Sequence, residues 1–114
     1  VRSIHVRFGA RFVARLLGPH EQAALARQSD PVPFLAKRFA AKEAALKALG
    51  TGLRAGIRWA DVQVVNGDFG QPQLLWQGEA ARRLSAFGPS VRALVSISDE
   101  RQHALAFVVI EAGC

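Results

Sequence analysis

Apolar residues in the first half of the chain recur with the spacing of amphipathic helices. The pattern predicts helices over residues 10–17, over residues 19–28, and from Val32 or Pro33 to Leu49. Each predicted helix ends at residues that interrupt helices, namely Gly18-Pro19, Asp30-Pro31 and Gly50-Thr51-Gly52. The first half of the chain is therefore expected to be helical.

The second half changes to the alternating pattern of strands, with β-branched runs and turn signals between them. Strands are predicted over residues 61–66, 73–77, 91–98 and 104–111, and a helix over residues 79–87. The last two strands read as a hairpin, since only the polar residues 99–103 separate them. Helices first and strands later indicate an α+β fold, with helices packed on an antiparallel sheet in a single domain over residues 1–114.

The longest predicted helix carries one cation in an unexpected place. On a helical wheel Leu35, Phe39, Leu46 and Leu49 fall within about 80° of one another, and Lys42 lies inside that apolar arc. A cation there has to reach solvent or meet an anion, because an unpaired buried charge is costly. Spacing alone favours an ordinary Glu43–Lys47 salt bridge worth about 0.3–0.5 kcal/mol. The position of Lys42 and the Gly50-Thr51-Gly52 that follows make one wall of a phosphate-binding site an equally good interpretation.

Composition and charge narrow the classes of protein. Half of the 114 residues are hydrophobic, which is enough for a core, yet no run approaches the length of a membrane span. The net charge of +6 favours polyanionic partners such as nucleic acid, phosphorylated molecules or an acidic protein. The one cysteine, Cys114, cannot form an internal disulfide, which favours a cytoplasmic protein. The chain contains no methionine, so we expect a cleaved or absent segment upstream of Val1.

One long motif with several companions resembles the holo-acyl-carrier-protein synthases of the 4′-phosphopantetheinyl transferase family. The motif reads Arg38-Phe39-Ala40-Ala41-Lys42-Glu43-Ala44, then Lys47-Ala48-Leu49-Gly50-Thr51-Gly52, and residues 34–37 extend it. Further matches follow in order at residues 59–62, 70–72, 95–100 and 104–110. The resemblance covers nearly the whole chain, from about residue 9 to residue 111.

The resemblance implies an enzyme that transfers the 4′-phosphopantetheine group of coenzyme A to a serine of apo-acyl carrier protein. The products would be holo-acyl carrier protein and adenosine 3′,5′-bisphosphate. Mg²⁺ would be the cofactor, with Glu43 as a metal ligand. The family is commonly trimeric, with coenzyme A in clefts between neighbouring chains, so a homotrimer is expected.

The same resemblance assigns further roles in catalysis and coenzyme A binding. Lys42 and Lys47 would contact phosphate or help remove the serine proton, and Arg38 would bind the 3′-phosphate with its guanidinium group. Gly50 and Gly52 would let the backbone approach the ligand. The remaining predicted contacts, which would frame the nucleotide from the sheet side, are Pro72, Ser96, Ser98 and Asp99.

Two departures from the family pattern bear on the site. The family's first motif is a strand, Gly-x-Asp, whose aspartate is the second metal ligand, and no aspartate occurs here before Asp30. The missing strand and ligand are expected upstream of Val1. Many members carry histidine where Asp99 stands, so the resemblance leaves the role of Asp99 open between the metal site, water orientation and an ordinary turn.

Arginines also recur every four residues near the start of the chain, at Arg7, Arg11 and Arg15. A solvated face is the ordinary explanation. The resemblance favours docking of the acidic carrier protein, through contacts that steer its encounter. Two rival functions are a basic nucleic-acid-binding module, for which the sequence lacks a recognisable signature, and an inactive relative with a structural role. No membrane and no nucleic-acid partner is expected.

Overall fold

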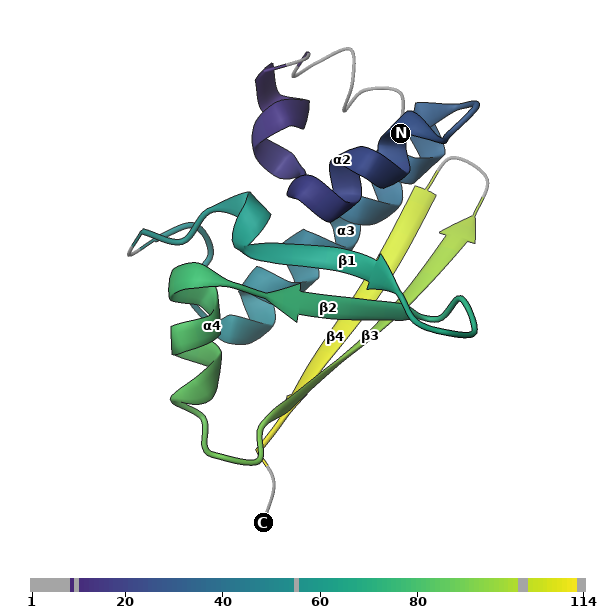
Figure 1. Cartoon of the computed structure of the whole chain (residues 1–114). Helices are drawn as coiled ribbons and strands as arrows, with labels where there is room; N and C mark the ends of the chain where they lie inside the picture. The colour runs from purple at the N-terminus through teal and green to yellow at the C-terminus, as the bar shows by residue number, and fades with distance from the viewer. Residues whose placement is uncertain (1–8, 10, 55, 101–102, 113–114) are drawn as a thin grey trace.

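The computed structural model describes residues 9, 11–54, 56–100 and 103–112. Helical structure over residues 11–16 comes first, and helices and strands then follow in the order that the sequence predicts (Figure 1). The elements are α2 (Pro19–Ala26), α3 (Pro31–Leu49), the 3-10 helix η1 (Trp59–Asp61), β1 (Val62–Asn66), β2 (Pro72–Trp76), α4 (Gly78–Ser85), β3 (Arg92–Glu100) and β4 (His103–Glu111). The predicted α+β class is confirmed.

The strands form two antiparallel pairs. β1 pairs with β2 from Val62 opposite Trp76 to Asn66 opposite Pro72. β3 pairs with β4 from Arg92 opposite Glu111 to Glu100 opposite His103, so the predicted hairpin is confirmed. Among the described strands no hydrogen-bonded ladder joins the two pairs, although β2 contacts β3. Figure 1 shows α3 running behind both pairs, and it contacts β1, β3 and β4.

The central helix α3 begins earlier than the sequence pattern predicts. Asp30 and Pro31 separate α3 from α2, as predicted, but α3 begins at Pro31 rather than at Val32 or Pro33. The Asp30 side chain accepts a hydrogen bond from the backbone N–H of Val32 at 3.2 Å, and Pro31 occupies the first turn, where its missing N–H costs nothing. The predicted end is confirmed: Gly50 follows Leu49 with a positive φ of 89°, a conformation that glycine adopts without strain.

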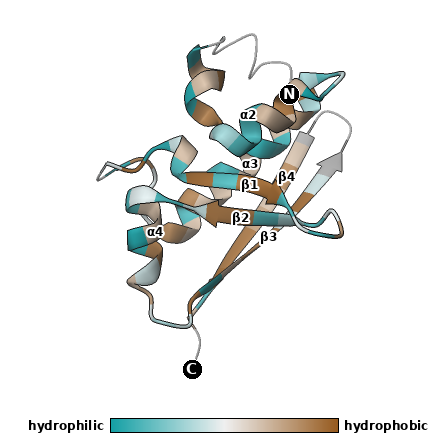
Figure 2. Cartoon of the chain, viewed as in Figure 1, coloured by the Kyte–Doolittle hydropathy of each residue, from teal (hydrophilic) through white to brown (hydrophobic). Residues whose placement is uncertain are grey.

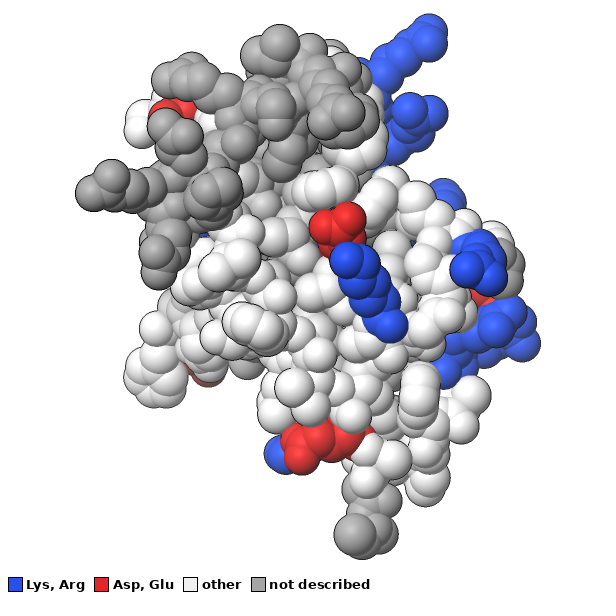
Figure 3. Space-filling view, turned by 180° about the vertical axis from the view of Figure 1, so that it is seen from behind, with Lys and Arg blue, Asp and Glu red and all other residues white. Residues whose placement is uncertain are grey.

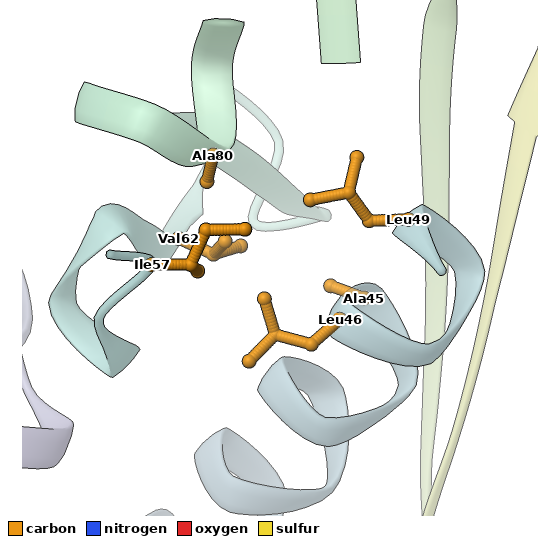
Figure 4. Close-up of a cluster of buried hydrophobic side chains, with 6 residues drawn as sticks. All are labelled: Ala45, Leu46, Leu49, Ile57, Val62 and Ala80. Atoms are coloured by element: carbon orange, nitrogen blue, oxygen red, sulfur yellow. The ribbon is translucent and has the colours of Figure 1, made fainter. Parts of the chain in front are cut away.

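Two apolar clusters lie along α3 and hold it in place. The C-terminal half packs in a cluster with β1, α4 and the segment before η1, made of Ala45, Leu46, Leu49, Ile57, Val62 and Ala80 (Figure 4). The N-terminal half packs against the preceding helices in a cluster of Val13, Leu16, Leu17, Phe34 and Leu35. Each large apolar side chain removed from water in this way contributes about 1.5–3 kcal/mol. The helix that carries the motif is thus fixed on two sides.

The β3–β4 hairpin has one covered face and one exposed apolar face. Along both strands half-buried and exposed residues alternate, and Val108 and Ile110 point to the core beside α3. Large apolar side chains nonetheless also lie on the exposed face, and Figure 2 colours much of β3 and β4 in shades of brown. The large side chains of the exposed face are Leu94, Leu105, Phe107 and Val109, which are 48%, 50%, 70% and 55% exposed. We call these four residues the outward hairpin face.

Candidate functional site

Two oppositely charged side chains of α3, Glu43 and Lys47, are presented to solvent one turn apart. Residues four apart lie on the same side of a helix, so the carboxylate and the ammonium group are neighbours. Among the ion pairs of the described residues none joins Glu43 to Lys47. The ordinary salt bridge is therefore not formed here, and both charges are available to a ligand.

Lys42, in contrast, is completely buried. Its ammonium group lies 2.5 Å from Oε1 of Glu21 and donates hydrogen bonds to the backbone oxygens of Leu16 at 2.5 Å and Trp59 at 3.0 Å. An ammonium group has three donors, and all three are engaged. Burial lowers the pKa of Lys42, and the attraction of Glu21 opposes that shift.

The buried position of Lys42 explains why the helical wheel placed it inside the apolar arc, and it corrects the direct roles predicted for this residue. The cation in the apolar arc does meet an anion, as the cost of an unpaired buried charge requires. Because its donors are taken inside the protein, Lys42 has none left for a direct phosphate contact or for moving the serine proton. The direct roles predicted for Lys42 are thus not supported by its position.

Arg38 lies one turn before Lys42 and lines a pocket. Only 8% of the residue is exposed, its guanidinium carbon sits 4.4 Å from the centre of the Phe34 ring, and its Nε is 3.5 Å from Oε2 of Glu21. Burial lowers the pKa of Arg38, again opposed by Glu21. The pocket has a volume of about 390 Å³ and is lined by Ala24, Arg27, Gln28, Phe34, Lys37, Arg38, Asn66, Pro72 and Ile97. We call it the basic pocket, because its charged lining residues are Arg27, Lys37 and Arg38.

Sequence reasoning missed Glu21, the carboxylate that both cations share. Glu21 is fully buried near the start of α2, where it accepts hydrogen bonds from the backbone N–H of Gly18 at 3.1 Å and of Val64 at 2.9 Å. A glutamate three residues after a helix cap is a recognisable signal, and here its side chain accepts from the backbone N–H of the cap residue Gly18. That signal predicts the start of a helix, but it does not predict that the same carboxylate pairs with Lys42 and Arg38 of α3.

The predicted residues of the sheet side divide between its two faces. Pro72 lines the basic pocket together with Arg38, as the resemblance implied. Ser96 and Ser98 are exposed on the other face of β3, opposite Phe107 and Leu105 of β4. Asp99 lies in β3 opposite Ala104. Within one chain, therefore, the structure joins Pro72 to Arg38 but leaves the two serines on the outward side.

The glycines after α3 both have positive φ angles. Gly50 ends the helix with φ 89°, and Gly52 follows with φ 58°. Both N–H groups donate to the carbonyl of Leu46, at 3.1 Å and 3.3 Å. The loop thus turns tightly off the helix, one turn beyond Lys47, and the positive φ explains why glycine stands at both positions.

Of the arginines predicted near the start of the chain, Arg15 lies at a second hollow. Arg11 and Arg15 are exposed, and Arg7 lies outside the described residues. Arg15 lines a pocket of about 660 Å³ that is otherwise largely apolar, with Phe12, Ala14, Leu53, Ile57, Arg58, Trp59 and Ala60. Phe12 packs edge-on against Trp59, with ring centres 6.2 Å apart. We call this hollow the apolar pocket.

Neither a complete metal cage nor a membrane helix is found in the described part of the chain. No group of three or more His, Cys, Asp and Glu side chains there could hold a metal ion. None of the described helices is both long and apolar enough to cross a membrane. Mg²⁺ commonly takes only one or two protein carboxylates with waters and substrate phosphate, and the exposed, unpaired Glu43 fits that requirement as one ligand.

Comparison with known proteins identifies close relatives. Residues 1–108 match the model of the 4′-phosphopantetheinyl transferase superfamily. The holo-[acyl-carrier-protein] synthase of Acidithiobacillus ferrooxidans is 50% identical over 111 residues, which are 96% of this chain and 86% of that protein. The crystal structure of the synthase from Neisseria meningitidis superposes with a TM-score of 0.83 at 39% identity, covering 95% of this chain and 86% of that one. The synthase of Bacillus anthracis in complex with CoA (3′,5′-ADP) gives a TM-score of 0.74 at 32% identity, over 90% and 82% of the chains.

Proposed function

Because the chain belongs to the 4′-phosphopantetheinyl transferase superfamily, we propose a holo-acyl-carrier-protein synthase site built around Glu43, Lys47 and Arg38. The enzyme transfers 4′-phosphopantetheine from coenzyme A to a serine of apo-acyl carrier protein. The serine oxygen bonds to the phosphorus of the phosphopantetheine phosphate, and that phosphorus loses its bond to the bridging pyrophosphate oxygen. Adenosine 3′,5′-bisphosphate leaves, and the serine proton is released.

The exposed pair on α3 would carry the pyrophosphate chemistry. Bound at Glu43, Mg²⁺ would neutralise charge on the pyrophosphate of coenzyme A. Lys47, one turn further along α3, supplies a free ammonium group that can bind a phosphate oxygen or take part in removing the serine proton. The observation that carries this assignment is that Glu43 and Lys47 share one side of the helix without pairing to each other.

The basic pocket is the site that we propose for the 3′-phosphate of coenzyme A. Arg27, Lys37 and Arg38 give its lining a positive charge, and Pro72 closes it from the β1–β2 hairpin. A dianionic phosphate suits this charge, and the guanidinium fork of Arg38 can bind two of its oxygens. Gly50 and Gly52 keep the backbone clear at the far end of α3, where the pantetheine arm would pass.

Ser96 and Ser98 can reach coenzyme A only if a neighbouring chain supplies them, since they share the outward side of the hairpin with apolar residues. The outward hairpin face is large and apolar, and such faces commonly mark association sites. We therefore propose that three copies of the chain meet through this face in a homotrimer. Ser96 and Ser98 of one copy would then contribute to the cleft of the next, and Asp99 keeps its predicted role as a nucleotide contact.

The apolar pocket is the proposed docking site for the carrier protein. Arg15 stands at its edge and Arg11 is exposed one turn earlier, so an acidic partner meets positive charge around an apolar hollow. Arg7, which lies outside the described residues, keeps its predicted role in carrier-protein docking. A cytoplasmic location would suit an enzyme with one cysteine and these two substrates.

Glu43→Gln is the direct test of the proposed metal site. The change keeps the shape of an exposed side chain but removes the charge that binds a cation, so transfer should fall by at least about a hundredfold while the fold persists. The assay would follow holo-acyl-carrier-protein formation at increasing Mg²⁺ with the full-length protein, and circular dichroism would report the fold.

Glu79→Gln on α4 is the matched control, because it removes a carboxylate that is already engaged with Arg82 and Arg83 of its own helix. Its activity should be close to that of the unaltered enzyme. Near-normal transfer by the Glu43 variant with unchanged Mg²⁺ dependence would remove Glu43 from the metal site.

A further inference from the structure

A single buried carboxylate ties the first helices, α3 and β1 together. The two oxygens of Glu21 receive the backbone N–H groups of Gly18 and Val64, and both also face cations of α3. Lys42 approaches Oε1 and Arg38 approaches Oε2. A carboxylate offers about four acceptor positions, so its capacity is filled.

The two cations share this carboxylate unequally. Lys42 lies 2.5 Å from Oε1, is fully enclosed, and depends on Glu21 for neutralisation because its other partners are uncharged carbonyls. Arg38 lies 3.5 Å from Oε2, and its Nε has no hydrogen-bond partner among the described residues. Glu21 therefore neutralises mainly Lys42 and leaves the charge of Arg38 largely uncompensated.

Counting the charges of the cluster also shows that Arg38 is not neutralised. Lys42 and Arg38 contribute two positive charges and Glu21 one negative charge, so the cluster keeps a net charge of +1. That charge is nearly buried at the wall of a pocket whose other charged lining residues, Arg27 and Lys37, are also basic. A surplus positive charge in this position is stabilised when an anion occupies the pocket.

We propose that Lys42 is a positioning residue for coenzyme A: by neutralising Glu21, it leaves the positive charge of Arg38 directed to the basic pocket. The proposal rests on the proposed binding of the 3′-phosphate by Arg38. It gives Lys42 a role in substrate affinity although its ammonium group cannot reach the substrate.

Removing Lys42 should weaken coenzyme A binding even though Lys42 makes no contact with the substrate. In Lys42→Met the carboxylate has only Arg38 as its counter-charge, so the cluster becomes neutral and Arg38 turns from the pocket. Coenzyme A should bind about tenfold more weakly, the effect of losing one charge-assisted contact. Glu21→Gln in the same molecule returns the net charge to +1, so the double variant should recover most of the affinity.

The experiment measures dissociation constants by calorimetry for coenzyme A and for 3′-dephospho-coenzyme A. The proteins are the full-length enzyme, Lys42→Met, Glu21→Gln/Lys42→Met, Arg38→Gln, and Arg38→Gln combined with Lys42→Met. The Lys42 effect should vanish in the Arg38→Gln background and with the dephosphorylated ligand. Lys37→Met is the matched control: Lys37 lines the pocket itself, so its effect should persist without Arg38.

The outcomes separate this inference from the assignment on which it rests. If Arg38→Gln leaves coenzyme A affinity unchanged, the proposed 3′-phosphate contact is wrong. If Arg38→Gln weakens binding but the Lys42 effect adds to it in full, or the double variant shows no recovery, the positioning role is wrong. Should Lys42→Met fail to fold, the test uses Glu21→Gln/Lys42→Met, in which both residues are uncharged. The proposal requires near-normal coenzyme A affinity from this double variant, so a large loss of affinity would contradict it.

Discussion

At the scale of single residues, Lys42 shows what a helical wheel can predict and what it cannot. The wheel places the cation inside the apolar arc of α3, and the structure confirms the consequence that it pairs with an anion. The identity of that anion could not be predicted, because Glu21 lies on another helix and only the packing of the helices brings the two together. The same packing removes Lys42 from direct contact with phosphate.

The unequal sharing of Glu21 predicts an order of stabilities. Glu21→Gln leaves two buried cations without a carboxylate, so the free energy of unfolding should drop by about 3–5 kcal/mol. Lys42→Met leaves Glu21 with Arg38 and two backbone N–H groups, and the loss should be about 2 kcal/mol. Urea denaturation followed by circular dichroism gives both values.

Glu43→Gln provides the comparison for these variants, since it makes the same substitution as Glu21→Gln at an exposed, unpaired position. Its unfolding curve should coincide with that of the unaltered protein. A Glu21→Gln protein as stable as Lys42→Met would show that the carboxylate is not the centre of the cluster.

At the scale of elements, periodicity identified β3 and β4 but not the role of each face. The sequence predicted strands over residues 91–98 and 104–111, within two residues of the observed bounds. Alternation usually distinguishes the buried from the exposed side of a strand. In this hairpin both sides are apolar, with Val108 and Ile110 at the core and Phe107 and Val109 outside. The placement of Ser96 and Ser98 away from the basic pocket was therefore not predictable.

Phe107→Lys tests whether the outward hairpin face joins copies of the chain. A lysine at the centre of an apolar interface would be buried without a partner, so the assembly should dissociate. Light scattering after size-exclusion chromatography should give the mass of one chain instead of three, and coenzyme A binding should weaken because Ser96 and Ser98 of the neighbour are lost.

Phe69→Lys is the control for charge added at an exposed aromatic residue. Phe69 is 95% exposed in the turn between β1 and β2, outside the outward hairpin face. This variant should keep the mass of the unaltered protein. An unchanged mass for Phe107→Lys as well would exclude the hairpin face as the subunit interface.

At the scale of the whole molecule, two hollows of different chemistry each have basic residues in their lining. The basic pocket lies between α2, α3 and the sheet, whereas the apolar pocket lies between the first helical segment and the loop before η1. Seen from behind, Lys and Arg side chains gather along the edge on which Figure 1 draws α4 (Figure 3). Net charge alone predicted polyanionic partners, but only the structure shows one basic hollow and one largely apolar hollow, for which we propose different partners.

Arg15→Glu tests whether the apolar pocket binds the carrier protein without affecting coenzyme A. A reversed charge beside the apolar pocket should repel an acidic carrier protein, so the rate of transfer at limiting carrier protein should drop about tenfold at low salt. The difference from the unaltered enzyme should shrink as salt screens the charges. Coenzyme A affinity should stay the same, because Arg15 lines the apolar pocket and not the basic one.

Arg82→Glu on α4 separates a local docking effect from a change in net charge. Both variants alter the charge of the protein by the same amount, but Arg82 pairs with Glu79 and lines neither pocket. If docking is local, only Arg15→Glu slows the reaction with carrier protein. Equal losses in the two variants would mean that the field of the whole molecule attracts the partner. A parallel loss of coenzyme A affinity in Arg15→Glu would mean that the two hollows belong to one continuous site.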